Sequence, residues 1–286
     1  MHHVEIMSVR SGKATLCTET RGAPSKGTIL MVMGATASMA WWPDGLLDAL
    51  ADGGYRVIRF DLRDTGQSTT QPPGAPDYDV ADLAADLIAI LDAHEVAAAH
   101  LVGMSLGGYL GQIAALQWPG RVRSLTLIAS EPLSTAYDNP GISPEFMAHF
   151  GAMGELDWSD RDAVAAFMLR IAELSAGPAT AFDRDAALKR IERELDRTPS
   201  IRSAFNHALL GGETGSDLVA RAIRQPTLVI HGTDDPVIPV AAAHASVGAI
   251  ANAQLMLLEG RGHELAPADL GRIAEAILVH AATAPA

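Results

Sequence analysis

The chain has 286 residues, of which 48% are hydrophobic and 19% charged, a balance typical of a globular protein with a large core. No apolar run reaches the length of a membrane span, and the formal net charge of −13 argues against nucleic acid and anionic membrane surfaces as partners. The sequence therefore predicts a protein that binds neither a membrane nor nucleic acid.

The cysteine content and the N-terminus indicate a compartment. The single cysteine, Cys17, cannot form an internal disulfide, which suits a reducing compartment and excludes a cysteine-based zinc site. Residues 1–5 lack the basic start and the apolar centre of a signal peptide. We therefore expect a cytoplasmic location.

Strand and helix patterns alternate through the first 130 residues. Residues 4–9 and 14–18 predict a β-hairpin, and apolar runs at 28–33, 55–60, 97–103 and 125–129 predict buried strands. Apolar residues at helical spacing lie between these runs, as at Leu83, Leu87 and Leu91. Because strands that alternate with helices form parallel sheets, the pattern predicts an α/β fold with a doubly wound, mostly parallel sheet.

Residues 131–212 interrupt this alternation. They contain helix signals but no convincing strand: capping boxes from Ser159 to Asp162 and from Thr180 to Asp183, and a stop at Gly211-Gly212. Strands are again expected at 226–231 and 254–258, and helices at 241–250 and 270–280. We therefore expect residues 1–130 and 213–286 to form the core, and residues 131–212 to form a helical cap inserted after the sixth strand.

A G-x-S-x-G pattern, filled by Gly103, Ser105 and Gly107, ends the run at 97–103. It indicates a buried strand that turns sharply into a helix, with the serine at a strained apex and the Leu106 amide in the first helical turn. An anion formed beside Ser105 would be stabilised there. The pattern alone fits a purely structural turn equally well.

Three chemically capable side chains follow predicted parallel strands: Ser105, Asp235 and His263. The carboxyl ends of such strands form one edge of the sheet, where ligands bind, so these side chains are expected to converge. A serine nucleophile needs a base, and a histidine base needs a carboxylate to orient it. Asp234 competes with Asp235 for the carboxylate role, and Glu131 is a third candidate.

These residues follow one another in the order nucleophile, acid, histidine. With this order the sequence resembles the α/β-hydrolase family over nearly the whole chain outside the cap. The resemblance implies an eight-stranded sheet, Ser105 as nucleophile and His263 as base. It favours Asp235 over Asp234, because the family's acid commonly precedes a proline or an arginine. It also implies an oxyanion hole formed by the amides of Leu106 and Ala35, although Met33 stands where relatives usually carry histidine.

A second resemblance lies in Arg63-Asp64-Thr65-Gly66, since most of the family has glycine at the Asp64 position. This version is similar to the branch that contains aclacinomycin methylesterase, which cleaves a methyl ester from an anthracycline polyketide. The resemblance implies a carboxylic ester hydrolase whose partner is a small-molecule ester, with no cofactor and no metal.

We expect the substrate to contact residues from the core and the cap, and its contacts are predicted at Gly34, Met104, Phe146, Phe150, Trp158 and His207. The alternative for the aromatic residues is that they only pack the cap's helices together.

Several alternatives to an esterase remain open. The same three residues also serve cofactor-free perhydrolases and haloperoxidase-like enzymes, lactonases and hydrolases of carbon-carbon bonds. A non-catalytic small-molecule binder on this fold is a further alternative. The sequence also leaves open whether the chain forms a homodimer.

Overall fold

The computed structural model describes residues 2–179, 181–211 and 218–284. In this part of the chain, eight strands form one sheet in the order β1-β2-β4-β3-β5-β6-β7-β8. The strands are β1 (Glu5–Ser11), β2 (Ala14–Arg21), β3 (Thr28–Val32), β4 (Arg56–Phe60), β5 (Ala99–Met104), β6 (Val122–Ile128), β7 (Thr227–Gly232) and β8 (Ala253–Leu258). Of these strands, β2 alone runs in the direction opposite to the others, so the predicted eight-stranded, mostly parallel sheet is confirmed.

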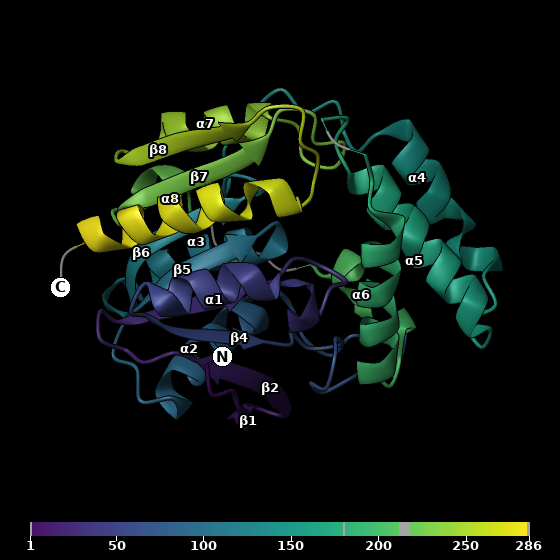
Figure 1. Cartoon of the computed structure of the whole chain (residues 1–286), viewed down its shortest axis with the longest axis horizontal. Helices are drawn as coiled ribbons and strands as arrows, with labels where there is room; N and C mark the ends of the chain where they lie inside the picture. Colours follow the sequence, from purple (N-terminus) through teal and green to yellow (C-terminus); the bar gives the residue numbers. More distant parts are fainter. Residues whose placement is uncertain (1, 180, 212–217, 285–286) are drawn as a thin grey trace.

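Helices cover both faces of the sheet (Figure 1). They are α1 (Asp44–Asp52) and α8 (Leu270–Thr283) on one face, and α2 (Val80–Ala93), α3 (Leu106–Gln117) and α7 (Ala241–Ala249) on the other. The alternation of side chains along β3 explains the two layers, because Ile29 and Met31 pack with α1 and α8 whereas Leu30 and Val32 pack with the opposite helices. No described helix is both long and apolar enough to cross a membrane.

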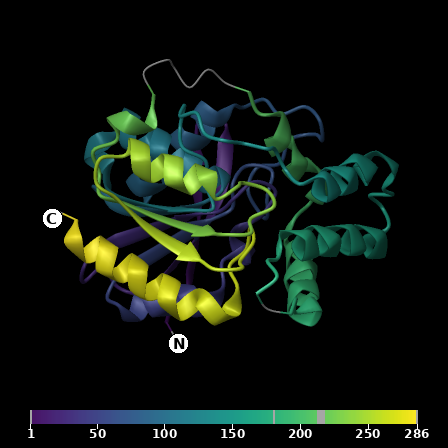
Figure 2. The ribbon, with the colours of Figure 1, turned by 90° about the horizontal axis from the view of Figure 1, so that it is seen from above.

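A group of helices lies between β6 and β7, and we call residues 131–179 and 181–211 the helical segment. Its helices are α4 (Pro144–Gly151), α5 (Arg161–Ser175), α6 (Arg184–Arg197) and the 3-10 helix η4 (Ile201–Leu209). Figures 1 and 2 show them beyond the carboxyl ends of the strands. Shorter 3-10 helices cover Met39–Trp41, Pro119–Arg121, Ala152–Glu155, Ala220–Ala222 and Pro267–Asp269. The segment has its own apolar cluster, which includes Phe167, Ile191 and Phe205.

The helix caps of this segment differ from the predicted ones. Asp160, not Ser159, caps α5, because its carboxylate accepts hydrogen bonds from the amides of the first turn while the Ser159 hydroxyl donates to Asp157. Asp183 caps α6. Thr180 and Gly212 lie outside the described residues, as does the predicted boundary between residues 212 and 213. The division into core and cap therefore stays a prediction.

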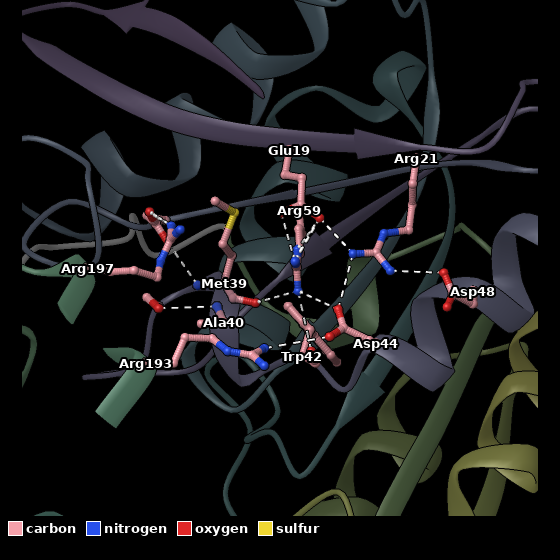
Figure 3. Close-up of polar contacts among 12 residues, drawn as sticks. Glu19, Arg21, Met39, Ala40, Trp42, Asp44, Asp48, Arg59, Arg193 and Arg197 are labelled. Atoms are coloured by element: carbon pink, nitrogen blue, oxygen red, sulfur yellow. Dashed lines mark hydrogen bonds and ion pairs between the residues drawn. The ribbon is translucent and has the colours of Figure 1, made fainter. Parts of the chain in front are cut away.

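One buried and one exposed pair of charges attach α6 to the sheet region (Figure 3). Arg197 donates to Asp61 Oδ2 over 2.7 Å, and the Asp61 carboxylate, which is fully buried, also accepts the Met39 amide. Arg193 lies 3.6 Å from Asp44. The helical segment is thus held partly by ion pairs that lie beside the carboxyl ends of the strands.

Candidate active site

Ser105 lies between β5 and α3 in a conformation that few residues other than glycine adopt, with φ 51° and ψ −119°. Hydrogen bonds to the end of β6 and the residues after it help to hold it there. Its amide donates to the Ile128 carbonyl over 2.8 Å, and the Ser130 hydroxyl donates to its carbonyl over 2.9 Å. Because the backbone turns at Ser105, the side chain faces the carboxyl edge of the sheet and not the core.

The neighbouring glycines make this turn possible. A Cβ on Gly107 would lie 2.0 Å from the Val32 carbonyl oxygen, and one on Gly103 would lie 2.3 Å from the Gly107 carbonyl oxygen. Real Cβ atoms do not approach so closely, so strand and helix pass each other only if these two positions lack side chains. The glycines of the G-x-S-x-G pattern are therefore required by the backbone.

His263 and Asp235 form a hydrogen bond, with 2.8 Å between His263 Nδ1 and Asp235 Oδ2. The other carboxylate oxygen of Asp235 accepts the amides of Val237 and Ile238 over 2.8 and 2.9 Å. Burial would raise the pKa of Asp235, but His263 and these amides outweigh it and lower the pKa. Asp235 is therefore an ionised partner that fixes the orientation of the ring.

The competing carboxylates have other partners. Asp234 is exposed, and its carboxylate accepts a hydrogen bond from the Thr233 hydroxyl. The Glu131 carboxylate accepts one from the Tyr137 hydroxyl. Of the three candidate acids, the structure places Asp235 against His263.

The loop that carries His263 is in backbone contact with the end of α5. The His263 amide donates to the Ser175 carbonyl over 2.7 Å. A Cβ on Gly262 would lie 2.1 Å from that same oxygen, and one on Gly177 would lie 2.2 Å from the Gly260 carbonyl oxygen. The end of α5 thus holds the backbone of the loop that carries His263.

Ser105 and His263 line one cavity of about 410 Å³. Among the described residues, the Ser105 hydroxyl has no hydrogen-bond partner, and His263 does not bond to it in this state. Such hydrogen bonds are often long without substrate and form when the site is filled. The two side chains therefore share one space, and a ligand carbonyl in that space can contact both.

Two amides next to Ser105 and at the cavity wall, those of Leu106 and Ala35, have no backbone partner in the part of the chain that the structure describes. Leu106 is the first residue of α3, and Ala35 is an exposed residue of the loop after β3, which we call the β3 loop (residues 33–38). Neither amide has an acceptor among the described residues. Gly34 brings this loop close to the serine, because a Cβ on it would lie 3.1 Å from the Ser105 Cβ.

Four of the predicted substrate contacts line the cavity: Gly34, Met104, Phe146 and Phe150. Other lining residues, which sequence reasoning missed, are Trp41, Ile142, Met147, Met168, Ile171 and Val237. Their side chains are apolar, and sequence spacing gave no sign that they face a ligand rather than each other.

The structure does not bring Trp158 and His207 to this cavity. Trp158 packs edge-on against Phe167 and Phe205, with ring centroids 6.3 and 5.6 Å apart. This agrees with the alternative that the aromatic residue only packs helices together. His207 is 6% exposed, and both of its ring nitrogens bind backbone groups.

A second cavity of about 310 Å³ shares Met33, Met104 and His263 with the first. It brings in Arg190 of α6, whose guanidinium carbon lies 5.4 Å from the centre of the Trp41 ring. Arg190 was missed, although its helical spacing from Ala186 and Ala187 places all three on one face of α6.

Residues 27–267 match the model of the alpha/beta hydrolase fold, so the chain belongs to this family. The fold and the serine turn described above agree with that membership.

Among curated relatives, the chain is similar to rhodomycin D methylesterase DauP of Streptomyces sp. (strain C5), with 30% identity over 95% of this chain and 96% of the relative. Rhodomycin D methylesterase DnrP of Streptomyces peucetius is 29% identical over the same shares. Among solved structures, the esterase RhEst1 from Rhodococcus sp. ECU1013 superposes with a TM-score of 0.78 at 23% identity, over 98% of this chain and 99% of that one. The chain is accordingly a hydrolase of the alpha/beta type.

Proposed function

We propose that the chain is a serine hydrolase that cleaves a carboxylic ester of a small molecule through an acyl-enzyme. The observation that carries this proposal is the hydrogen bond between His263 and Asp235. The His263 side chain lines the same cavity as Ser105, which lies at a strained turn. The similarity to methylesterases supports it.

The roles follow from where each proton can lie. Ionised Asp235 accepts from His263 Nδ1, which leaves Nε2 as the nitrogen without a proton. Nε2 then takes the Ser105 proton as the oxygen attacks the ester carbonyl, and the amides of Leu106 and Ala35 bind the oxyanion. His263 returns the proton to the departing alcohol, and water, activated by the same nitrogen, releases the acid.

The substrate class follows from the lining of the cavity. Phe146 and Phe150 stack with ring centroids 5.1 Å apart, and their neighbours in the cavity are apolar. Such walls favour a flat apolar body, because aromatic faces gain from stacking and apolar surface from burial. The proposed substrate is a methyl ester of an aromatic polyketide-like small molecule.

Replacement of the nucleophile tests the reaction. Ser105→Ala should lower the turnover of short p-nitrophenyl esters by about a thousandfold or more and abolish labelling by a fluorophosphonate probe. Ser246→Ala is the matched control, since this hydroxyl is buried in α7 and has no partner among the described residues. Undiminished turnover in Ser105→Ala, with the control unchanged, would refute the proposal.

A substrate panel tests the bond that is cleaved. The methyl ester of a polycyclic aromatic acid should give a higher kcat/KM than the methyl ester of a short aliphatic acid. Lactones, peroxide with an organic acid, and vinylogous diketones probe the lactonase, perhydrolase and carbon-carbon alternatives. A preference for one of these over every ester would overturn the proposed reaction.

A further inference from the structure

The β3 loop holds a strained residue next to the proposed oxyanion donor. Thr36 adopts φ 65°, a left-handed conformation that is strained for a residue with a Cβ. Such a conformation persists only when surrounding contacts enforce it. The Ala35 amide is one peptide away, so whatever holds Thr36 also limits how the Ala35 amide can turn.

His207 supplies the contact that holds Thr36. This residue lies in η4 of the helical segment, 171 positions further along the chain, and its Nδ1 lies 3.0 Å from the Thr36 nitrogen. Its Nε2 lies 2.8 Å from the Arg63 carbonyl oxygen in the loop after β4. The ring thus connects two loops of the sheet's carboxyl edge, and both of its nitrogens are used.

The protonation of His207 is fixed by these partners. The Thr36 amide is a donor, so Nδ1 must accept and carry no proton, and Nε2 must donate to the Arg63 carbonyl. Burial lowers the pKa of His207, although the Arg63 carbonyl and Asp64 act in the opposite direction. The ring is therefore neutral at physiological pH, which preserves the bond to Thr36.

A second residue of the helical segment holds the same loop. Glu194 of α6 accepts the Ser38 hydroxyl over 2.5 Å and the Ser38 amide over 3.4 Å. Beside His207, Asn206 binds other groups: its side chain donates to Asp64 and accepts the Gly74 amide over 2.7 Å. Of these neighbours in η4, only His207 reaches the β3 loop.

We propose that His207 is a positioning residue for the oxyanion hole: by accepting the Thr36 amide, it holds the Ala35 amide in the direction of the Ser105 oxygen. This inference rests on the proposed function. A histidine from the helical segment thus holds the loop that carries the proposed donor. The oxyanion hole is then complete only while η4 is docked.

Substitutions at His207 separate positioning from packing. His207→Ala should lower kcat for p-nitrophenyl esters by about 10- to 100-fold with KM nearly unchanged, since loss of a whole oxyanion donor costs about 100- to 1,000-fold. His207→Asn should recover most of kcat, because its amide oxygen can occupy the place of Nδ1. His207→Gln places its amide near the position of Nε2 and should stay impaired.

Binding of an aryl trifluoromethyl ketone tests the oxyanion hole separately from stability. The ketone forms an adduct with serine that carries an oxyanion, so its affinity for the folded protein depends on the oxyanion donors. Its affinity should fall in His207→Ala by the same factor as kcat and recover in His207→Asn. Asn206→Ala is the matched control, since it loosens the same turn without contact to the β3 loop. It should lower Tm and leave both kcat and the ketone affinity of the folded protein unchanged.

Two results would overturn the inference. One is a His207→Ala variant whose kcat and ketone affinity, corrected for the folded fraction, equal those of the wild type. The other, decisive if His207→Ala does not fold, is equal activity of the Asn and Gln variants. In both cases Ser105→Ala would still be inactive and the proposed function would stand, whereas a wild type that ignores the ketone and the fluorophosphonate would refute the function itself.

Discussion

In β3 all five residues are buried, whereas α6 buries only Ala187, Ile191 and Glu194 among its 14. The sheet is sandwiched between two large apolar clusters, and its strand-to-helix turn tolerates no extra atom. The helical segment has one smaller cluster of its own and reaches the sheet region through hydrogen bonds and ion pairs. Packing therefore fixes the turn that carries Ser105, while hydrogen bonds and ion pairs hold the helical segment against the sheet region.

If this comparison is right, substitutions at the carboxyl edge of the sheet should have the largest effects on activity. Asp235→Asn should lower kcat about 1,000- to 10,000-fold, because the amide can no longer hold His263 in the required tautomer. Asp234 lies two residues after the end of the same strand, β7, but is exposed, so Asp234→Asn should change kcat little. Steady-state kinetics with a p-nitrophenyl ester measures both, and equal effects at the two positions would contradict the assignment.

Gly107→Ala tests how closely the sheet and α3 are packed. The added Cβ would meet the Val32 carbonyl, and we expect a loss of about 3 kcal/mol or more in the free energy of unfolding. Gly111→Ala in the same helix is the control: its Cβ would lie 3.4 Å from Leu125, and alanine should stabilise the helix by up to about 1 kcal/mol. Urea denaturation measures both, and a neutral Gly107→Ala would mean that strand and helix can separate.

Arg197→Met tests the attachment of α6. Asp61 would stay buried without its charged partner, so we expect a loss of about 3 kcal/mol in the free energy of unfolding. Arg161→Met removes an exposed pair with Asp196 within the helical segment and should cost less than about 1 kcal/mol. Similar losses in the two variants would show that the buried pair contributes no more than a surface one.

Glu194 predicts a smaller effect that depends on pH. Burial raises its pKa from an ordinary 4.5 to about 7, aided by Asp61 and opposed by the Ser38 donors and Arg197. Between these values the folded chain binds the proton more tightly than the unfolded chain, so this carboxyl makes stability fall as pH rises through the window.

Glu194→Gln cannot ionise and should lack that fall. Its Tm relative to wild type should rise from pH 5 to pH 8. A Tm difference that is flat, or that moves in favour of the wild type at high pH, would contradict a buried carboxyl that resists ionisation.

The sequence predicted the features that depend on hydrophobic periodicity and on local backbone sterics. Continuous apolar runs predicted the parallel strands, and the glycines around Ser105 predicted the turn, because both follow from local sterics. The hydrolase class and the fold are confirmed by the family match and the methylesterase relatives. The roles of Ser105, Asp235 and His263 stay proposals that their geometry supports.

The contacts of the helical segment could not be predicted in the same way. His207 was expected at the substrate, yet it binds Thr36 and Arg63, which are distant in sequence and offer only backbone groups. A carbonyl or an amide carries no sequence signal, so no pattern could have paired them with this ring. Ser159 failed as a cap for a related reason, since Asp157 competes for its hydroxyl.

The glycine contacts between the end of α5 and the histidine loop also have a consequence for the shape of the site. At Gly177 and Gly262 two main chains touch with no side chain between them that could swing aside. A side chain added at either glycine would therefore push the two main chains apart. Ile142 and Met147, by contrast, line the cavity and are 40% and 52% exposed on the α4 side. Around α4, the cavity therefore borders solvent through the side chains of Ile142 and Met147.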